Sequence, residues 1–138
     1  MAAAPKRFPS KHPTGVHRAS GGRLLDVFKQ PQVPTVDVEE AATRLADGAM
    51  LVDVRESFEW QASRVPGAIH RPVGDINDWW EELPSDRDVI FICHTGGRSA
   101  QVVQALSSQA GMTNVWNLAG GIVAWANGGQ PVDDEPEP

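Results

Sequence analysis

The sequence of 138 residues is poor in several features, and each shortage excludes a class of protein. It has a single cysteine, which excludes an intramolecular disulfide framework and a zinc or iron–sulfur site built from several cysteines. No apolar run approaches the ~18 residues that a membrane-spanning helix needs. No lysine follows Lys29, and the residues after position 30 carry 6 cations against 17 anions. Such an acidic body does not suit nucleic acid, whose phosphates a binding face must neutralise.

Composition divides the chain into a central domain and two polar ends. Residues 1–30 carry 6 cations against a single anion and contain many Pro, Ser and Gly residues, which predicts a basic, largely disordered arm. This arm lacks the apolar stretch of a secretory signal, so we expect a cytoplasmic protein. Residues 133–138 are acidic and punctuated by proline, and we expect a disordered tail there. Residues 31–132 hold the apolar segments that a single hydrophobic core requires.

Within this domain, apolar segments of strand length alternate with patterns of helical spacing. The expected strands cover 35–36, 50–54, 68–69, 89–92 and 115–118, and the expected helices cover 38–46, 56–61, 75–83 and 99–109, with a further helix beginning at 122. The segment 89–92 is almost continuously apolar, which is typical of a central strand covered on both faces. Strands separated by helices predict an α/β fold with a mainly parallel sheet and helices on both of its faces.

The residues that carry chemistry gather at one strand–loop–helix junction. The apolar strand is followed by Cys93, by the pair Gly96-Gly97, by Arg98 and by the start of a helix. Ligands of open parallel sheets bind beyond the carboxyl ends of the strands, where Cys93 lies. Glycine-rich loop amides and a helix N-terminus both stabilise an anion, and an arginine adds a permanent positive charge. A lone cysteine is usually a small buried hydrophobe, but these neighbours favour its nucleophilic thiolate form.

Four segments in order resemble the single-domain rhodaneses, a family of sulfurtransferases. The loop 93–99 is similar to the family's active-site loop, and 51–56 resembles its early strand and the turn that follows. The segment 65–70 resembles its IPGAIN turn, and 117–125 resembles its NLxGGIxAW segment near the C-terminus. The resemblance covers about residues 35–130. It implies a three-layer rhodanese-like fold, in agreement with the pattern of strands and helices.

The resemblance also implies a reaction. Cys93 would be the catalytic nucleophile, taking a sulfane sulfur from a small anionic donor such as thiosulfate. The resulting persulfide would pass the sulfur to cyanide or to a thiol, including a thiol on a partner protein, without a metal or an organic cofactor. The expected substrate-binding residues are His94, Thr95, Gly96, Gly97, Arg98 and Ser99. In this scheme the loop amides cradle the outer sulfur, Arg98 orients the donor, and Ser99 begins the helix.

The resemblance also implies that Asp53 and Arg55 lie close beneath the loop, where we favour a role in holding its shape over direct catalysis. The alternative for Arg55 is an ion pair with Asp53 or Glu56. The chain departs from the family at Ser63-Arg64, where a Gly-His pair is common. Arg64 is therefore either a cation that binds the donor or, as we favour, a solvated surface residue. His94 is a poor candidate for a general base, because neighbouring side chains in a loop usually point apart.

Two other functions compete with turnover of small molecules. A carrier that presents a persulfide to one partner protein would have the same cysteine and the same loop. A cysteine phosphatase of the same fold would have five residues between cysteine and arginine, whereas four separate Cys93 from Arg98. The shorter loop leaves less room for a phosphate, so we consider this function the least favoured.

Overall fold

The computed structural model describes residues 33–134. The basic arm expected over 1–30 and the last residues, 135–138, lie outside the described range. Within that range, no helix is both long enough and apolar enough to cross a membrane.

A five-stranded parallel sheet forms the centre of the molecule, with the strand order β1-β6-β5-β2-β4. Its strands are β1 (Thr35–Val36), β2 (Met50–Asp53), β4 (Ile69–His70), β5 (Val89–Ile92) and β6 (Val115–Leu118). All four residues of the central strand β5 are buried. Strands β2 and β5 run in register, so that Asp53 lies opposite Ile92, the residue before Cys93. The register brings the carboxyl ends of these strands to one edge of the sheet.

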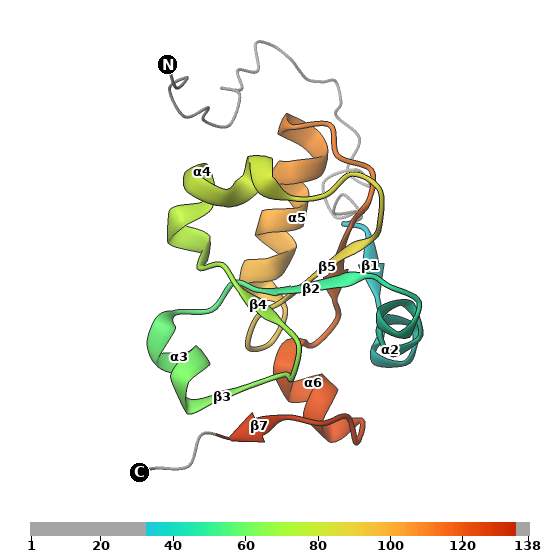
Figure 1. The fold of residues 1–138 in the computed structure, drawn as a ribbon, viewed down its shortest axis with the longest axis vertical. Coiled ribbons are helices and arrows are strands. Elements are labelled where there is room, and N and C mark those ends of the chain that lie inside the picture. The colour runs from blue at the N-terminus through green and yellow to red at the C-terminus, as the bar shows by residue number, and fades with distance from the viewer. Residues whose placement is uncertain (1–32, 135–138) are drawn as a thin grey trace, which may run out of the picture.

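Helices cover both faces of the sheet, which makes three layers (Figure 1). One face is covered by α5 (Gly97–Gln109) and α4 (Ile76–Trp79). The core between these helices and the sheet includes Phe91 and Leu106. The other face is covered by α2 (Val38–Ala46) and α6 (Gly121–Asn127), and its core includes Ile90 and Trp125. Alternate residues of β5 thus enter opposite cores. The predicted α/β fold with a mainly parallel sheet is confirmed.

The prediction of a single helix over 75–83 is wrong. The structure has three short pieces instead: the 3-10 turn η2 (Val73–Asp75), the helix α4 and the 3-10 turn η3 (Trp80–Glu82). The helical path breaks at Trp79, whose φ of −123° is outside the helical range. The break lets the Trp79 ring enter the core beside Phe91, at 6.3 Å between ring centroids, while Trp80 stays half-buried. Two adjacent side chains cannot share one face of a continuous helix.

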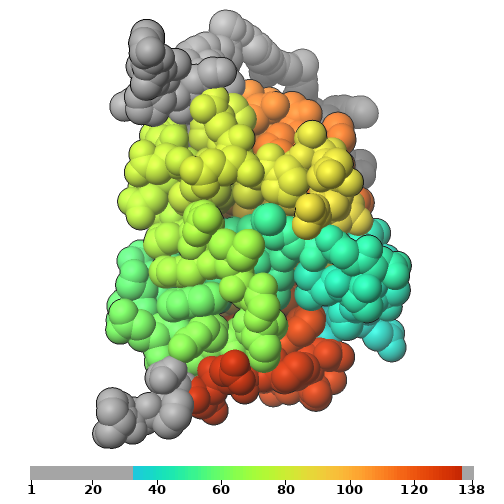
Figure 2. All heavy atoms as spheres, viewed as in Figure 1, coloured from blue at the N-terminus to red at the C-terminus, as the bar shows by residue number. Residues whose placement is uncertain are grey.

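A second, small sheet corrects the expected domain boundary. The disordered tail was expected to begin at Asp133, but Asp133–Asp134 form β7, which pairs antiparallel with β3 (Ser63–Arg64). Asp133 lies opposite Arg64, so side chains of opposite charge face each other across the pair. In Figure 2 the red end of the described chain lies against the green segment that contains β3. The pairing joins the C-terminal end of the described chain to the strand that follows α3 (Ser57–Ala62).

Candidate active site

Cys93 lies at the carboxyl end of β5, and its side chain is buried, with 1% exposed. Its Sγ atom accepts three hydrogen bonds from the first turn of α5. The donors are the Gly96 N–H at 3.1 Å, the Ser99 N–H at 3.3 Å and the Ser99 hydroxyl at 3.3 Å. The N-terminus of the 13-residue helix, with its positive dipole end, points at the same atom. Hydrogen-bond donors and a helix N-terminus therefore converge on this sulfur, where they would stabilise negative charge.

Gly96 makes this cradle possible. Its φ is +106°, a left-handed conformation that side chains rarely adopt, and a Cβ at this position would lie 3.2 Å from the backbone nitrogen of Gly120. The turn directs the Gly96 N–H inward and starts α5 at Gly97, two residues before the start that the sequence predicts. Ser99 is consequently not the beginning of the helix, as expected, but a fully buried residue of its first turn.

The Ser99 hydroxyl lies within hydrogen-bond distance of three acceptors, one of which is the Gly96 carbonyl at 3.5 Å. Its Oγ is 3.3 Å from Cys93 Sγ and 2.6 Å from Oδ1 of Asn117 in β6. Asn117 is also buried, with 7% exposed. Since a hydroxyl has a single proton to donate, Asn117 competes with the sulfur for it. The amide of Asn117 therefore belongs to the environment of the thiol, although it lies one strand away.

The start of α6 closes the loop from the other side. The N–H groups of Ile122 and Val123 donate to the carbonyl oxygens of Cys93 and His94, at 2.8 and 3.2 Å. These bonds hold the two carbonyls against α6 and fix the orientation of the peptide planes in the loop. Gly121, with φ of +61°, permits this approach, because a Cβ there would overlap both carbonyl oxygens. The sequence motif that contains Gly120 and Gly121 thus supports the cysteine loop directly.

Arg98 is held by a carboxylate. Its two terminal nitrogens donate to Oε1 and Oε2 of Glu59 in α3, at 2.8 and 3.0 Å. The Glu59 Oε1 atom also accepts the N–H of Glu56, which caps the same helix. The bond to Arg98, together with the Glu56 N–H, lowers the pKa of Glu59 from 4.5 to about 2. Glu59 in turn raises the pKa of Arg98, and the Cys93 sulfur adds to this effect, so these charges lie within electrostatic reach.

Asp53 and Arg55 form a second ion pair, which is fully enclosed. The Arg55 guanidinium donates to both carboxylate oxygens of Asp53 at 2.9 to 3.1 Å, and the exposed fractions of the two side chains are 3% and 0%. Arg55 also donates to the carbonyl of Ser63, and its own carbonyl accepts from His70 Nε2. The pair therefore ties β2 to the end of α3 and to β4. Of the two ion pairs considered for Arg55, with Asp53 or with Glu56, the structure has the one with Asp53.

The remaining predicted residues lie on the rim or away from it. His94, Thr95 and Gly97 are exposed on the outer side of the loop. Arg64 donates to the carbonyl of Trp60 at 2.8 Å, and its guanidinium lies 5.3 Å from the centroid of the Trp60 ring. These contacts place Arg64 on the small sheet beside α3.

Two residues of the site, Glu59 and Asn117, were not predicted. A carboxylate in a short helix has no spacing that reveals its partner, so no signal in the sequence identifies Glu59. Asn117 gave a usable signal, since a polar residue inside a buried strand requires a hydrogen-bond partner.

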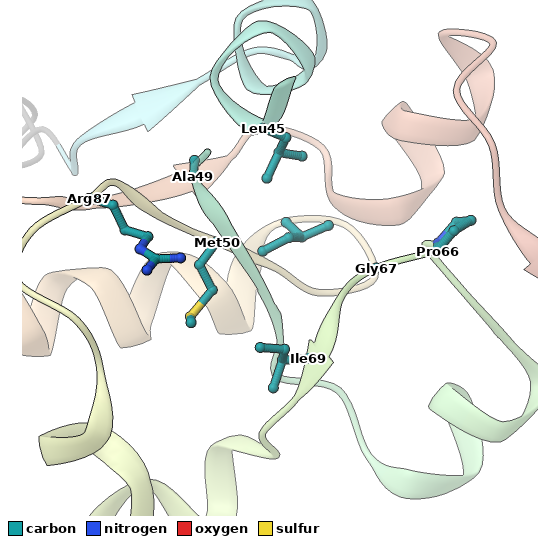
Figure 3. A pocket seen from close by; sticks show the side chains of 8 residues that line it. Leu45, Ala49, Met50, Pro66, Gly67, Ile69 and Arg87 are labelled. Carbon is teal, nitrogen blue, oxygen red and sulfur yellow. The ribbon is translucent and has the colours of Figure 1, made fainter. Parts of the chain in front are cut away.

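The pocket drawn in Figure 3 lies elsewhere. It has a volume of about 360 Å³ and is lined by 8 residues, most of them apolar, from α2, β2, the turn at Pro66 and β4, together with Arg87. None of the residues that contact Cys93 Sγ belongs to it. The hydrogen-bond donors around the sulfur and this pocket therefore lie in different parts of the molecule.

Known proteins resemble this chain in sequence and in structure. The family model described as Rhodanese-like domain matches residues 37–128. A sulfurtransferase of Allochromatium vinosum is 40% identical over 102 residues, covering 72% of this chain and 94% of that protein. The putative sulfur carrier protein YrkF of Bacillus subtilis is 31% identical over 101 residues, covering 73% of this chain and 48% of that protein. The crystal structure of a rhodanese-related protein from Thermoplasma volcanium superposes with a TM-score of 0.65 at 28% identity, covering 72% and 96% of the two chains.

The parallel three-layer fold defines an α/β protein with a buried, hydrogen-bonded cysteine at the carboxyl edge of its sheet. The chain belongs to the rhodanese-like domain family, as the match over 37–128 and the sulfurtransferase of A. vinosum show. The resemblance found in the four sequence segments is thereby confirmed.

Proposed function

We propose that this chain is a sulfurtransferase in which Cys93 carries the transferred sulfur as a persulfide. The observation that supports this function best is the set of three hydrogen bonds to Cys93 Sγ from Gly96 and Ser99. These donors would stabilise negative charge on the sulfur during transfer, in a loop where α6 holds the Cys93 and His94 carbonyls. The chain's similarity to a protein named sulfurtransferase points to the same chemistry.

The reaction proceeds in two steps. In the first, the Cys93 thiolate attacks the outer sulfur of a donor such as thiosulfate. A bond between Sγ and that sulfur forms, the donor's S–S bond breaks, and sulfite leaves with the bonding electrons. In the second, cyanide or a thiolate attacks the outer sulfur of the persulfide, and Cys93 is released as a thiolate. Neither step requires a metal or an organic cofactor.

The residues after Cys93 have distinct roles in this scheme. The outer persulfide sulfur carries negative charge, and the backbone N–H groups from His94 to Arg98 surround the position that it takes. His94, Thr95 and Gly97 form the exposed rim past which donor and acceptor approach. Arg98 lies at the same rim and orients the donor, while Ser99 stabilises the leaving thiolate. Asp53 and Arg55 hold the supporting elements in place.

The second candidate is a carrier that delivers its persulfide to one partner protein. The similarity to the putative sulfur carrier YrkF favours this candidate specifically. The two functions differ in the acceptor and not in Cys93 itself. Rapid turnover with thiosulfate and cyanide would identify an enzyme for small molecules, and slow turnover accelerated by a protein thiol would identify a carrier.

Intact-protein mass spectrometry tests the proposed function. We expect thiosulfate to add one sulfur, ~32 Da, to Cys93 and cyanide to remove it, because the activated thiolate attacks sulfane sulfur. Cys93→Ser should show no gain in mass while keeping its melting temperature, since a hydroxyl does not form a stable persulfide. A sulfur gained by the serine variant, or none gained by the wild type from any sulfane donor, would contradict the proposal.

A further inference from the structure

The charge balance around Cys93 bears on which donors the loop accepts. Arg98 is the arginine that the loop itself supplies, and both of its terminal nitrogens bind Glu59. Three negative groups raise the pKa of this guanidinium, namely Glu59, the Cys93 sulfur and Glu56. The other arginine within electrostatic reach of Glu59 is Arg55, and Asp53 neutralises it. The positive charge beside the thiol is therefore already compensated by carboxylates.

This balance disfavours a donor that brings two negative charges. Thiosulfate is a dianion, and on reaching the Cys93 thiolate it meets a second anion in Glu59. A donor whose outer sulfur is attached to an uncharged organic group brings one negative charge or none. The repulsion from Glu59 grows with the charge of the donor, so it is larger for thiosulfate than for a monoanion, and it is screened little where the pair is half-buried.

We propose that Glu59 is a specificity-determining residue, which by holding Arg98 makes the loop prefer organic sulfane donors, such as alkyl persulfides and alkanethiosulfonates, over dianionic thiosulfate. The proposal rests on the proposed function, because it concerns the step that loads sulfur onto Cys93. Glu59 need not touch the donor. It acts through the guanidinium that it binds and through its own charge.

Two donors that differ by one charge provide the test. Thiosulfate and methanethiosulfonate both present an outer sulfur bonded to an oxidised sulfur, but the first is a dianion and the second a monoanion. Thiolate attack on either leaves the same Cys93 persulfide, with sulfite or methanesulfinate as the leaving group. The rate of loading is followed by intact mass for each donor. The ratio of the two rates cancels any change in the reactivity of Cys93 itself.

Glu59→Gln is the principal variant. Glutamine is accepted at the third position of a capping box, so helix α3 keeps its start and the fold is maintained. Removing one unit of negative charge from the partner of Arg98 should lower the ratio of the methanethiosulfonate rate to the thiosulfate rate by roughly tenfold, mainly through faster loading by thiosulfate. Glu59→Asp, which keeps the charge, should retain a ratio close to that of the wild type.

Glu40→Gln is the matched control. Glu40 forms an ion pair with Arg44 on α2, remote from Cys93, and its loss changes the net charge by the same amount. Its ratio should equal that of the wild type. An unchanged ratio in Glu59→Gln, or an equal fall in Glu40→Gln or in Glu59→Asp, would overturn the role of Glu59. Failure of both donors to load the wild-type protein would instead overturn the proposed function.

Discussion

The two ends of the same parallel strands differ sharply in this molecule. At the carboxyl ends of β2 and β5 lie an enclosed ion pair, a buried thiol and the N-terminus of α5. At the amino end of β2, near the C-terminus of α2, lies the pocket of about 360 Å³, in which Arg87 is the charged residue among the 8 that line it (Figure 3). The buried ion pair and the thiol thus lie at the carboxyl end of these strands, while the pocket at the amino end has a single charged residue in its lining.

The direction of the helices explains the difference. Helices that follow parallel strands begin at the carboxyl edge, so that edge receives their free N–H groups and positive dipole ends. The amino edge receives helix C-termini, such as the last turn of α2 with Arg44. An anionic sulfur is therefore stabilised at one edge only. For a reacting atom as small as sulfur, hydrogen-bond donors locate the site better than cavity volume does.

The largest effect should come from the enclosed ion pair. Asp53→Asn leaves the Arg55 guanidinium buried without its carboxylate, and we expect a loss of about 3–5 kcal/mol in the free energy of unfolding. Urea denaturation measures this loss. The exposed pair of the control variant Glu40→Gln should cost less than about 0.5 kcal/mol. Equal losses in the two variants would show that burial does not distinguish the pairs.

A smaller effect is expected at the sulfur itself. Ser99→Ala removes the hydroxyl that donates to Cys93 Sγ, and a lost bond to a charged acceptor should slow alkylation of Cys93 by iodoacetamide at neutral pH by roughly tenfold. Ser108→Ala is the control, because Ser108 lies on the same helix and donates only to the Gln104 carbonyl. An alkylation rate that does not change in Ser99→Ala would show that the Ser99 hydroxyl does not contribute to the reactivity of Cys93.

The Glu59–Arg98 pair predicts a pH dependence of stability. Because Arg98 lowers the pKa of Glu59 to about 2, the stabilisation is complete above the ordinary value of 4.5 and is lost as the pH falls through about 2. Glu59→Gln should therefore melt at a lower temperature than the wild type at pH 7, by an amount that corresponds to about 1 kcal/mol or less. The two melting temperatures should converge toward pH 2. A difference in melting temperature that widens as the pH falls would contradict a stabilising role of the ionised Glu59 carboxylate.

The smallest effect is expected at the amino edge. Arg87→Gln changes the charge of the pocket in Figure 3 while leaving the carboxyl edge intact. Loading of Cys93 by thiosulfate should stay within about twofold of the wild type, as is usual for a surface substitution remote from the chemistry. A tenfold loss would mean that the pocket takes part in the reaction and that the two edges are not independent.

The sequence was sufficient for the sheet and for the thiol. Strand β5 is apolar throughout, and the glycines that follow Cys93 indicate a turn into a helix. The strand and the position of the thiol could therefore both be predicted from local patterns. The partner of Arg98 could not be predicted, because 39 positions separate Arg98 from Glu59 and an ion pair produces no periodic pattern in the sequence. The interrupted helix around Trp79 and the strand at Asp133 were also missed. In both, tertiary contacts override a local pattern, through burial of the Trp79 ring and through pairing with β3.

The contact between α6 and the cysteine loop has a consequence for folding. The carbonyls of Cys93 and His94 gain their partners only when Ile122 and Val123, which come much later in the chain, have docked. A folding intermediate with β5 and α5 formed but α6 absent would hold the cysteine without the frame that fixes its loop. Reactivity of the thiol should therefore arise late in refolding, after most of the sheet. The rate at which Cys93 becomes able to accept sulfur would report the last step of chain assembly.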